Sequence, residues 1–121
     1  MRRVYQGFGW GLVLLGALHM LTTFRAFDAL TSAAVWFFGA GIAMSLVGAL
    51  NLLNATYGHA ARGLRFTAIV TNLAMIIYAS LAGLASRASL VELVVIVGLV
   101  ASTTALSLLL ATAGAPPGGS T

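Results

Sequence analysis

Residues 32–54 read SAAVWFFGAGIAMSLVGALNLLN and lie inside a longer run, 29–61, that contains no Asp, Glu, Lys or Arg. A helix needs about 20 apolar residues, each rising about 1.5 Å, to cross the hydrocarbon core of a bilayer. Lipid offers no hydrogen-bond partners to the backbone, so a spanning segment of this kind must satisfy its own backbone as a helix. The stretch therefore predicts a transmembrane α-helix.

Three further uncharged stretches flank this one, at residues 4–24, 66–86 and 93–121. Together they predict helices at about 5–24, 32–54, 65–85 and 89–112, with short connections. Short connections make consecutive helices antiparallel neighbours, so we expect an all-α membrane protein with an up-down-up-down four-helix bundle. Residues 1–112 then form one transmembrane domain, and residues 113–121, which include two prolines and three glycines, form a flexible tail.

The composition excludes several classes of function. Hydrophobic residues make up 60% of the chain and charged residues 7%, whereas soluble domains carry about 25% charged residues. Cysteine is absent, which removes disulfides, thiolate metal sites and thiol redox chemistry. The net charge of +4 comes from arginines scattered between apolar runs, so we expect anionic lipid headgroups as partners and no nucleic acid.

Arginine placement predicts the orientation in the membrane. Four arginines lie in the N-terminus and the second connection, against two in the first and third connections: Arg2, Arg3, Arg62 and Arg65 against Arg25 and Arg87. The positive-inside rule then puts both termini in the cytoplasm, with the chain in the cytoplasmic (inner) membrane. We expect the first helix to be retained, because Arg25 and Asp28 occupy the region where a signal peptide would be cleaved.

Small residues recur at helical spacing and predict close helix contacts, since packing drives helix association in lipid. The pattern favours packing within the bundle, and a homo-oligomer contact is the alternative. The residues concerned are Gly7, Gly9, Gly11 and Gly16, then Gly41, Ser45, Gly48 and Ala49, then Gly98, Ser102 and Ala105. Aromatic residues near the helix ends, Tyr5 among them, are typical of interfacial belts.

His19 lies within the first predicted helix, toward its outer end. Ionisable groups inside a span usually face the bundle interior or an aqueous cavity. One interpretation is a neutral histidine hydrogen-bonded inside the bundle, and the other is a proton-handling or ligand-contacting group. Asp28 and Glu92 are predicted on the same side and are candidate partners, and Trp36 is a candidate wall of a ligand cage.

The two histidines bear on haem binding. Two axial ligands must reach one iron from opposite faces, but His59 falls in the cytoplasmic connection, a membrane thickness of about 30 Å from His19. We therefore expect no cofactor or metal within one subunit. A pair of His19 residues from two subunits of a dimer remains the alternative.

A second polar set lies toward the cytoplasmic half of the second and third helices: Asn51, Asn54, Thr67, Thr71 and Asn72. Because these helices are consecutive, the side chains should meet. Amides and hydroxyls in such positions are common interhelical hydrogen-bonding pairs, which is the interpretation we favour. A polar pocket for a headgroup or a quinone-like ligand is the alternative.

The run of His19, Trp36-Phe37-Phe38-Gly39-Ala40-Gly41, Gly48 and Asn51 resembles uncharacterised small four-helix integral membrane proteins of bacteria, over most of residues 5–85. This resemblance implies the fold and brings no activity, cofactor or binding residue.

The chain has no nucleophile–base pair, no phosphate-binding loop, no carboxylate in the first helix and no arginine ladder. We therefore do not expect an enzyme. The first hypothesis is a non-enzymatic accessory or scaffold subunit that packs against a partner or itself, in a homo-oligomer or a larger membrane complex. The alternatives are a small oligomeric transporter, or a lipid- or cofactor-binding protein, that uses His19 and the asparagines.

Overall fold

The computed structural model describes residues 1–87 and 89–113. Within these ranges the chain is all-helical: α1 spans Arg2–Ala26, α2 Ser32–Tyr57, α3 Arg62–Ala85 and α4 Leu90–Ala113. All four helices are long and apolar enough to cross a membrane, which confirms the expected all-α multi-pass fold. Their ends lie within three residues of the predicted bounds. The predicted flexible tail falls, beyond residue 113, outside the described residues.

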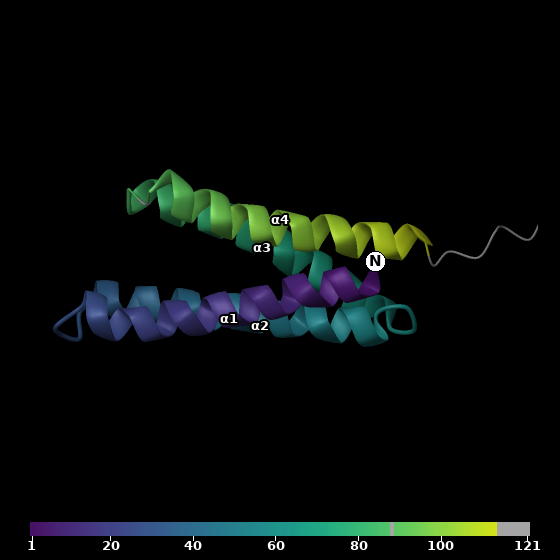
Figure 1. Ribbon diagram of the computed structural model, residues 1–121, viewed down its shortest axis with the longest axis horizontal. Helices are drawn as coiled ribbons and strands as arrows, with labels where there is room; N and C mark the ends of the chain where they lie inside the picture. Colours follow the sequence, from purple (N-terminus) through teal and green to yellow (C-terminus); the bar gives the residue numbers. More distant parts are fainter. Residues whose placement is uncertain (88, 114–121) are drawn as a thin grey trace, which may run out of the picture.

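The helices run alternately up and down and pair as two hairpins, α1 with α2 and α3 with α4 (Figure 1). The N-terminus, the α2–α3 connection and the end of α4 lie at one end of the bundle, which we call the terminal end. The α1–α2 and α3–α4 connections lie at the other, which we call the turn end. The ribbons of the two hairpins approach each other most closely toward the terminal end (Figure 1).

Glycines bring the backbones of α1 and α2 into direct contact. A Cβ on Gly48 would lie 2.7 Å from the carbonyl oxygen of Gly9, and one on Gly16 would lie 2.5 Å from that of Gly41. Ser45, between these contacts, donates a hydrogen bond of 3.2 Å from its hydroxyl to the Val13 carbonyl. The predicted small residues that form this interface, where a larger side chain would hold the helices apart, are Gly9, Gly16, Gly41, Ser45 and Gly48. Gly7 and Ala49 are exposed, and a Cβ on Gly11 would face Leu99 of α4.

An apolar core joins all four helices near the middle of the bundle: Leu12, Met44, Val47, Met75 and Val100. Outside it, large apolar side chains remain exposed along every helix. Exposed leucines and aromatic rings would be costly in water, whereas lipid is as apolar as they are. The exterior therefore fits contact with hydrocarbon.

Local signals set two helix starts. The hydroxyl of Thr31 accepts a 3.2 Å hydrogen bond from the Ala34 amide at the start of α2. At the start of α4, the carboxylate of Glu92 accepts hydrogen bonds from the amide and the hydroxyl of Ser89, both at 2.9 Å, and the Glu92 amide donates back to the Ser89 hydroxyl at 3.3 Å. This reciprocal arrangement is a capping box, which satisfies amides that the first helical turn leaves free.

Candidate functional site

A buried hydrogen-bond network connects all four helices in the half of the bundle nearer the terminal end. Asn51 of α2 and Asn72 of α3 form a reciprocal amide pair, with N–H···O distances of 2.7 and 2.9 Å. The Tyr5 hydroxyl of α1 donates to Asn51 Oδ1 at 2.6 Å. Asn54 Nδ2 donates to the Tyr5 oxygen at 2.8 Å and to Ser107 Oγ of α4 at 3.0 Å. The network thus ties both hairpins together through polar side chains.

The direction of every hydrogen bond in this network follows from one backbone group. The Val47 carbonyl receives a bond of 2.8 Å from Asn51, and a carbonyl can only accept, so the amide nitrogen of Asn51 must face it. Asn51 Oδ1 then faces Tyr5, and the phenol must donate its proton there. The Tyr5 oxygen is left as an acceptor, so the side of Asn54 that faces it must be the NH2 group.

This orientation turns the remaining oxygen of Asn54 away from Tyr5 and Ser107. Among the described residues, Asn54 Oδ1 is the one buried side-chain polar atom without a hydrogen-bond partner. It lies against Gly58, where the chain leaves α2, because a Cβ on Gly58 would collide with it. A buried acceptor without a partner is unfavourable and is rare in folded proteins, so this atom calls for a donor from outside the chain.

A cavity of about 130 Å³ opens beside Asn54 at the terminal end. Its wall contains Tyr5, Asn54, Gly58 and Ser107, and its rim contains three basic side chains, those of Arg2, His59 and Arg65. Arg2 and His59 are exposed, whereas Arg65 is half-buried. We call this cavity, with its three basic side chains, the terminal pocket.

The structure brings together only part of the predicted polar set. Asn51, Asn54 and Asn72 belong to one network, as the favoured interpretation expects. Thr67 is exposed and donates to the Gly63 carbonyl at 2.9 Å, within its own helix, and Thr71 is half-buried outside the network. Within the described residues, neither threonine forms a hydrogen bond between α2 and α3.

Tyr5 and Ser107 are the members of the network that the sequence analysis missed. Tyr5 is only 1% exposed, so its interpretation as an interfacial belt residue is wrong. The helical spacing could have indicated that Tyr5 faces inward. Tyr5, Gly9, Leu12 and Gly16 follow one another three or four residues apart, so they share one face of the helix, and all are buried. Hydrophobicity alone could not show it, since the apolar residues surround the whole helix.

His19 lies near the turn end, half-buried on α1. Its ring stacks on that of Phe37 of α2, with centroids 3.8 Å apart and planes inclined by 21°. The hydroxyl of Thr23 donates to the His19 backbone carbonyl at 3.2 Å. The stacking contact holds the imidazole of α1 against Phe37 of α2.

The other three candidate residues at the turn end, Glu92, Asp28 and Trp36, do not form a bonded site with His19. Glu92 is near enough to interact electrostatically with His19, but its carboxylate caps α4. Asp28 is exposed in the α1–α2 connection, and Trp36 is 71% exposed on the outside of α2. In the described part of the chain, no hydrogen bond or ion pair links any of them to His19. The histidines are likewise separate, because His59 lies at the terminal end.

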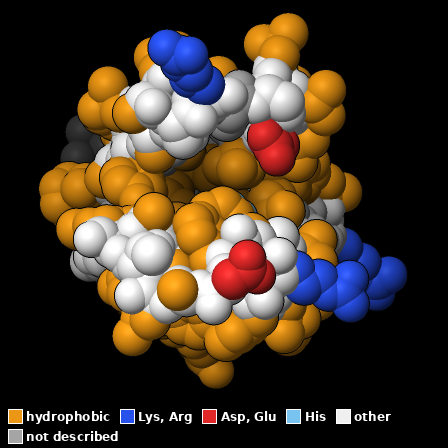
Figure 2. All heavy atoms as spheres, turned by 90° about the vertical axis from the view of Figure 1, so that its left-hand side faces the viewer, with side chains coloured by type: hydrophobic (Ala, Val, Ile, Leu, Met, Phe, Trp, Pro, Cys, Tyr) orange, Lys and Arg blue, Asp and Glu red, His pale blue; other side chains and the backbone are white. Residues whose placement is uncertain are grey.

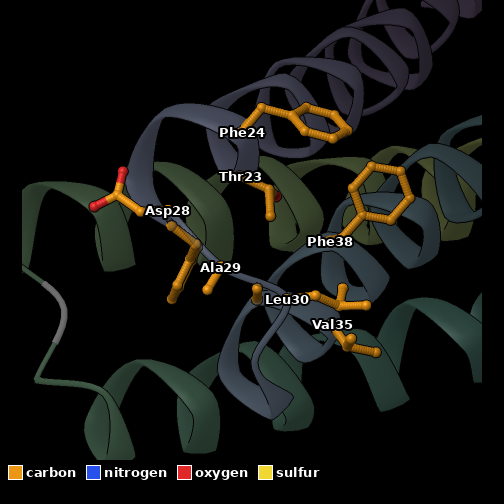
Figure 3. Close-up of a pocket in the computed structure, with 9 residues that line it drawn as sticks. Thr23, Phe24, Asp28, Ala29, Leu30, Val35 and Phe38 are labelled. Carbon is orange, nitrogen blue, oxygen red and sulfur yellow. The ribbon is translucent and has the colours of Figure 1, made fainter.

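A larger cavity of about 440 Å³ opens at the turn end within the α1–α2 hairpin (Figure 3). Phe24 and Phe38 meet edge to face above it, with ring centroids 6.0 Å apart, and Leu30 and Val35 line it from below. The Asp28 carboxylate points away from these side chains (Figure 3). The hydroxyl of Thr23 is already bonded to its own helix, so the cavity offers an almost wholly apolar surface.

No protein-family model, curated protein or solved structure matches this chain. The chemistry of its sites therefore rests on their own atoms. In residues 1–87 and 89–113, no three His, Asp or Glu side chains gather as a metal site would require. The terminal pocket combines a basic rim with a buried acceptor.

Proposed function

We propose that the protein is a non-enzymatic accessory or scaffold subunit of the bacterial cytoplasmic membrane that acts by packing its helices against a partner or a second copy of itself. The observation that carries this proposal is the network of Tyr5, Asn51, Asn54, Asn72 and Ser107. Apart from Asn54 Oδ1, its members use their polar groups on one another and on the Val47 carbonyl, across four helices, and so act as structural bonds. The outer helix surfaces are left as the part available for function.

The outer face of α4 supports this proposal. Gly98, Ala101 and Ala105 are exposed there, at spacings of three and four residues, and a Cβ on Gly98 would meet nothing within 4 Å. Ser102, which the sequence grouped with this face, is half-buried and turns partly inward. Small residues in a row permit close approach of another helix, and in lipid such close packing drives association.

The transporter alternative has less support from the geometry. A path through the protein needs polar groups that face a continuous cavity, whereas the asparagines face each other. His19 stacks on Phe37 at the other end of the bundle. The two polar regions that the alternative would connect are separated by the apolar core around Leu12 and Val100.

We expect the substitutions Gly98→Leu and Ala101→Leu to abolish association. Leucine side chains would project from the proposed contact face and keep a second helix at a distance. The measurement is the number of polypeptides per particle after purification in mild detergent, by sedimentation velocity. The matched controls, Ala49→Leu and Ala74→Leu, add the same bulk to exposed positions on α2 and α3 and should leave the complex intact. A wild-type protein that purifies as a single chain contradicts the proposal.

The proposed orientation puts the terminal end in the cytoplasm. Arg2, Arg3, Arg62 and Arg65 support it, since the four lie at or near that end. The chain contains no cysteine, so single cysteines can be introduced without background. We expect a membrane-impermeant maleimide to label Ala29→Cys in spheroplasts and Ala60→Cys only after lysis. The reverse pattern would place the termini outside.

A further inference from the structure

We propose that the terminal pocket binds a phosphodiester headgroup that carries a small neutral polyol, the chemistry of phosphatidylglycerol. The proposal goes beyond the accessory role and does not depend on it, because the pocket lies inside one subunit. It rests on two independent observations: a buried acceptor without a partner, and a rim that is cationic and, among the residues that the structure describes, has no carboxylate.

The acceptor is Asn54 Oδ1. Asn54 is 8% exposed, so it is more than nine-tenths buried, and its oxygen has no hydrogen-bond partner. Turning the amide over would not help, because its nitrogen is held by the Tyr5 oxygen, which cannot donate a second proton. We assign the missing partner of this oxygen to an O–H or N–H donor of a ligand held in the pocket.

The rim supplies positive charge. Arg2, Arg65 and His59 line the mouth, while both side-chain carboxylates, those of Asp28 and Glu92, belong to the turn end (Figure 2). A planar guanidinium presents parallel N–H groups that match the oxygens of a phosphate. The half-buried Arg65 lies where headgroup phosphates of a surrounding bilayer would be found, next to the ends of α2 and α3.

Together these features select among lipid headgroups. Ethanolamine and serine carry an ammonium donor, but two guanidinium groups at the mouth repel a second cation. Choline is a cation with no hydrogen-bond donor. Glycerol has neutral hydroxyl donors that satisfy Asn54 Oδ1 while its phosphate meets the arginines. A cavity of about 130 Å³ has room for a small polyol fragment.

Native mass spectrometry of the detergent-purified protein tests the hydroxyl requirement directly. Phosphatidylglycerol is compared with phosphatidylethanol, which keeps the phosphodiester charge and lacks the hydroxyls. We expect phosphatidylglycerol to bind about tenfold more tightly, as one lost hydrogen bond to a buried acceptor implies. Phosphatidylethanolamine and phosphatidylcholine should bind more weakly still. Equal binding of phosphatidylglycerol and phosphatidylethanol would mean that water satisfies Asn54, and it would overturn the proposal.

Charge-removing variants test the rim. Arg65→Gln and Arg2→Gln should each weaken phosphatidylglycerol binding about tenfold, since each removes a charge-assisted bond to the phosphate. Arg62→Gln and Arg3→Gln remove the same charge from the same end without touching the pocket, and should change affinity less than twofold. If all four variants weaken binding equally, the effect is general attraction to anionic lipid and the site is refuted.

A pocket-filling variant separates the site from protein stability. Ala111→Leu extends a lining residue into the cavity and leaves the hydrogen bonds of Asn54 in place. We expect it to abolish the preference for phosphatidylglycerol over phosphatidylethanol while the thermal unfolding midpoint without added lipid stays unchanged. A retained preference in this variant would place the lipid elsewhere.

Phosphodiesters that carry a polyol also exist as soluble molecules, so soluble competitors show whether the pocket binds a lipid headgroup or a free phosphodiester. Glycerophosphoglycerol and inorganic phosphate are added to the phosphatidylglycerol complex. We expect neither to displace the lipid at millimolar concentration, because the acyl chains contribute to binding along the helices. Displacement by glycerophosphoglycerol would assign the pocket to a soluble phosphodiester and overturn the lipid assignment. Subunit association is tested separately on the Gly98→Leu protein. The result of that test does not depend on whether the terminal pocket binds lipid.

Discussion

A protein with Gly16→Leu should fail to form the α1–α2 hairpin, and Gly16→Ala should lower the free energy of unfolding by about 1–3 kcal/mol, the usual cost of overpacking a tight interior. A Cβ at this position would lie 2.5 Å from the Gly41 carbonyl oxygen and 2.7 Å from the Ser45 amide nitrogen. Both atoms belong to the backbone, which cannot move aside as a flexible side chain would. The helices must separate, and the Ser45–Val13 hydrogen bond is lost with the contact.

The measurement is the thermal unfolding midpoint in mild detergent, followed by the fluorescence of Trp10 and Trp36. The controls are Gly7→Ala and Gly39→Ala, where a Cβ would meet nothing within 4 Å. These should be neutral or slightly stabilising, because alanine favours a helix over glycine by up to about 1 kcal/mol. A Gly16→Ala protein as stable as its Gly7→Ala control would show that α1 and α2 are not in backbone contact.

The second large effect is expected for Asn51→Leu, at about 1–3 kcal/mol of lost stability. Asn51 takes part in four side-chain hydrogen bonds, with Tyr5, Val47 and twice with Asn72. Leucine leaves the Asn72 amide and the Tyr5 proton buried without partners. Interhelical bonds in membranes are individually weaker, averaging about 0.6 kcal/mol, so the size of the effect depends on these orphaned groups.

A double-mutant cycle checks that explanation. In the Asn51→Leu/Asn72→Leu protein the two apolar side chains face each other, so its loss should be smaller than the sum of the two single losses. Tyr5→Phe is the graded comparison. It removes the donor to Asn51 Oδ1, which keeps its bond from Asn72, and the acceptor of Asn54 Nδ2, which keeps its bond to Ser107. Because no group loses its last partner, the cost should be about 0.5–1.5 kcal/mol. Additive single and double effects would mean that the amide pair does not form.

The sequence was sufficient for the helices, because membrane spans are set by length and hydrophobicity, which need no tertiary information. It also indicated that Asn51 and Asn72 would meet, since they lie on consecutive antiparallel helices. It could not identify Tyr5 as their partner, because α1 is apolar all round and a tyrosine near a helix end is as typical of an interface as of a core. Which face turns inward was decided by glycine contacts with α2.

The terminal pocket shows another limit of sequence reasoning. Arg2, His59 and Arg65 come from two segments far apart in the chain, and Ser107 comes from a third. The sequence grouped the arginines as orientation signals, which is their effect on membrane insertion. Their position around Asn54 depends on the side on which α4 packs, and short connections alone do not determine that.

The glycine contacts of the α1–α2 hairpin also bear on the order of assembly during synthesis. The α1–α2 hairpin has its glycine contacts and its own Tyr5–Asn51 and Asn54–Tyr5 hydrogen bonds, so it can shelter its polar groups before the rest of the chain leaves the ribosome. Domains and subdomains generally fold from the N-terminus as they emerge. Asn72 and then Ser107 would join afterwards, one helix at a time. The 58–61 connection would then be a point where the chain can be cut, and the two halves, made as separate polypeptides, should find each other in the membrane.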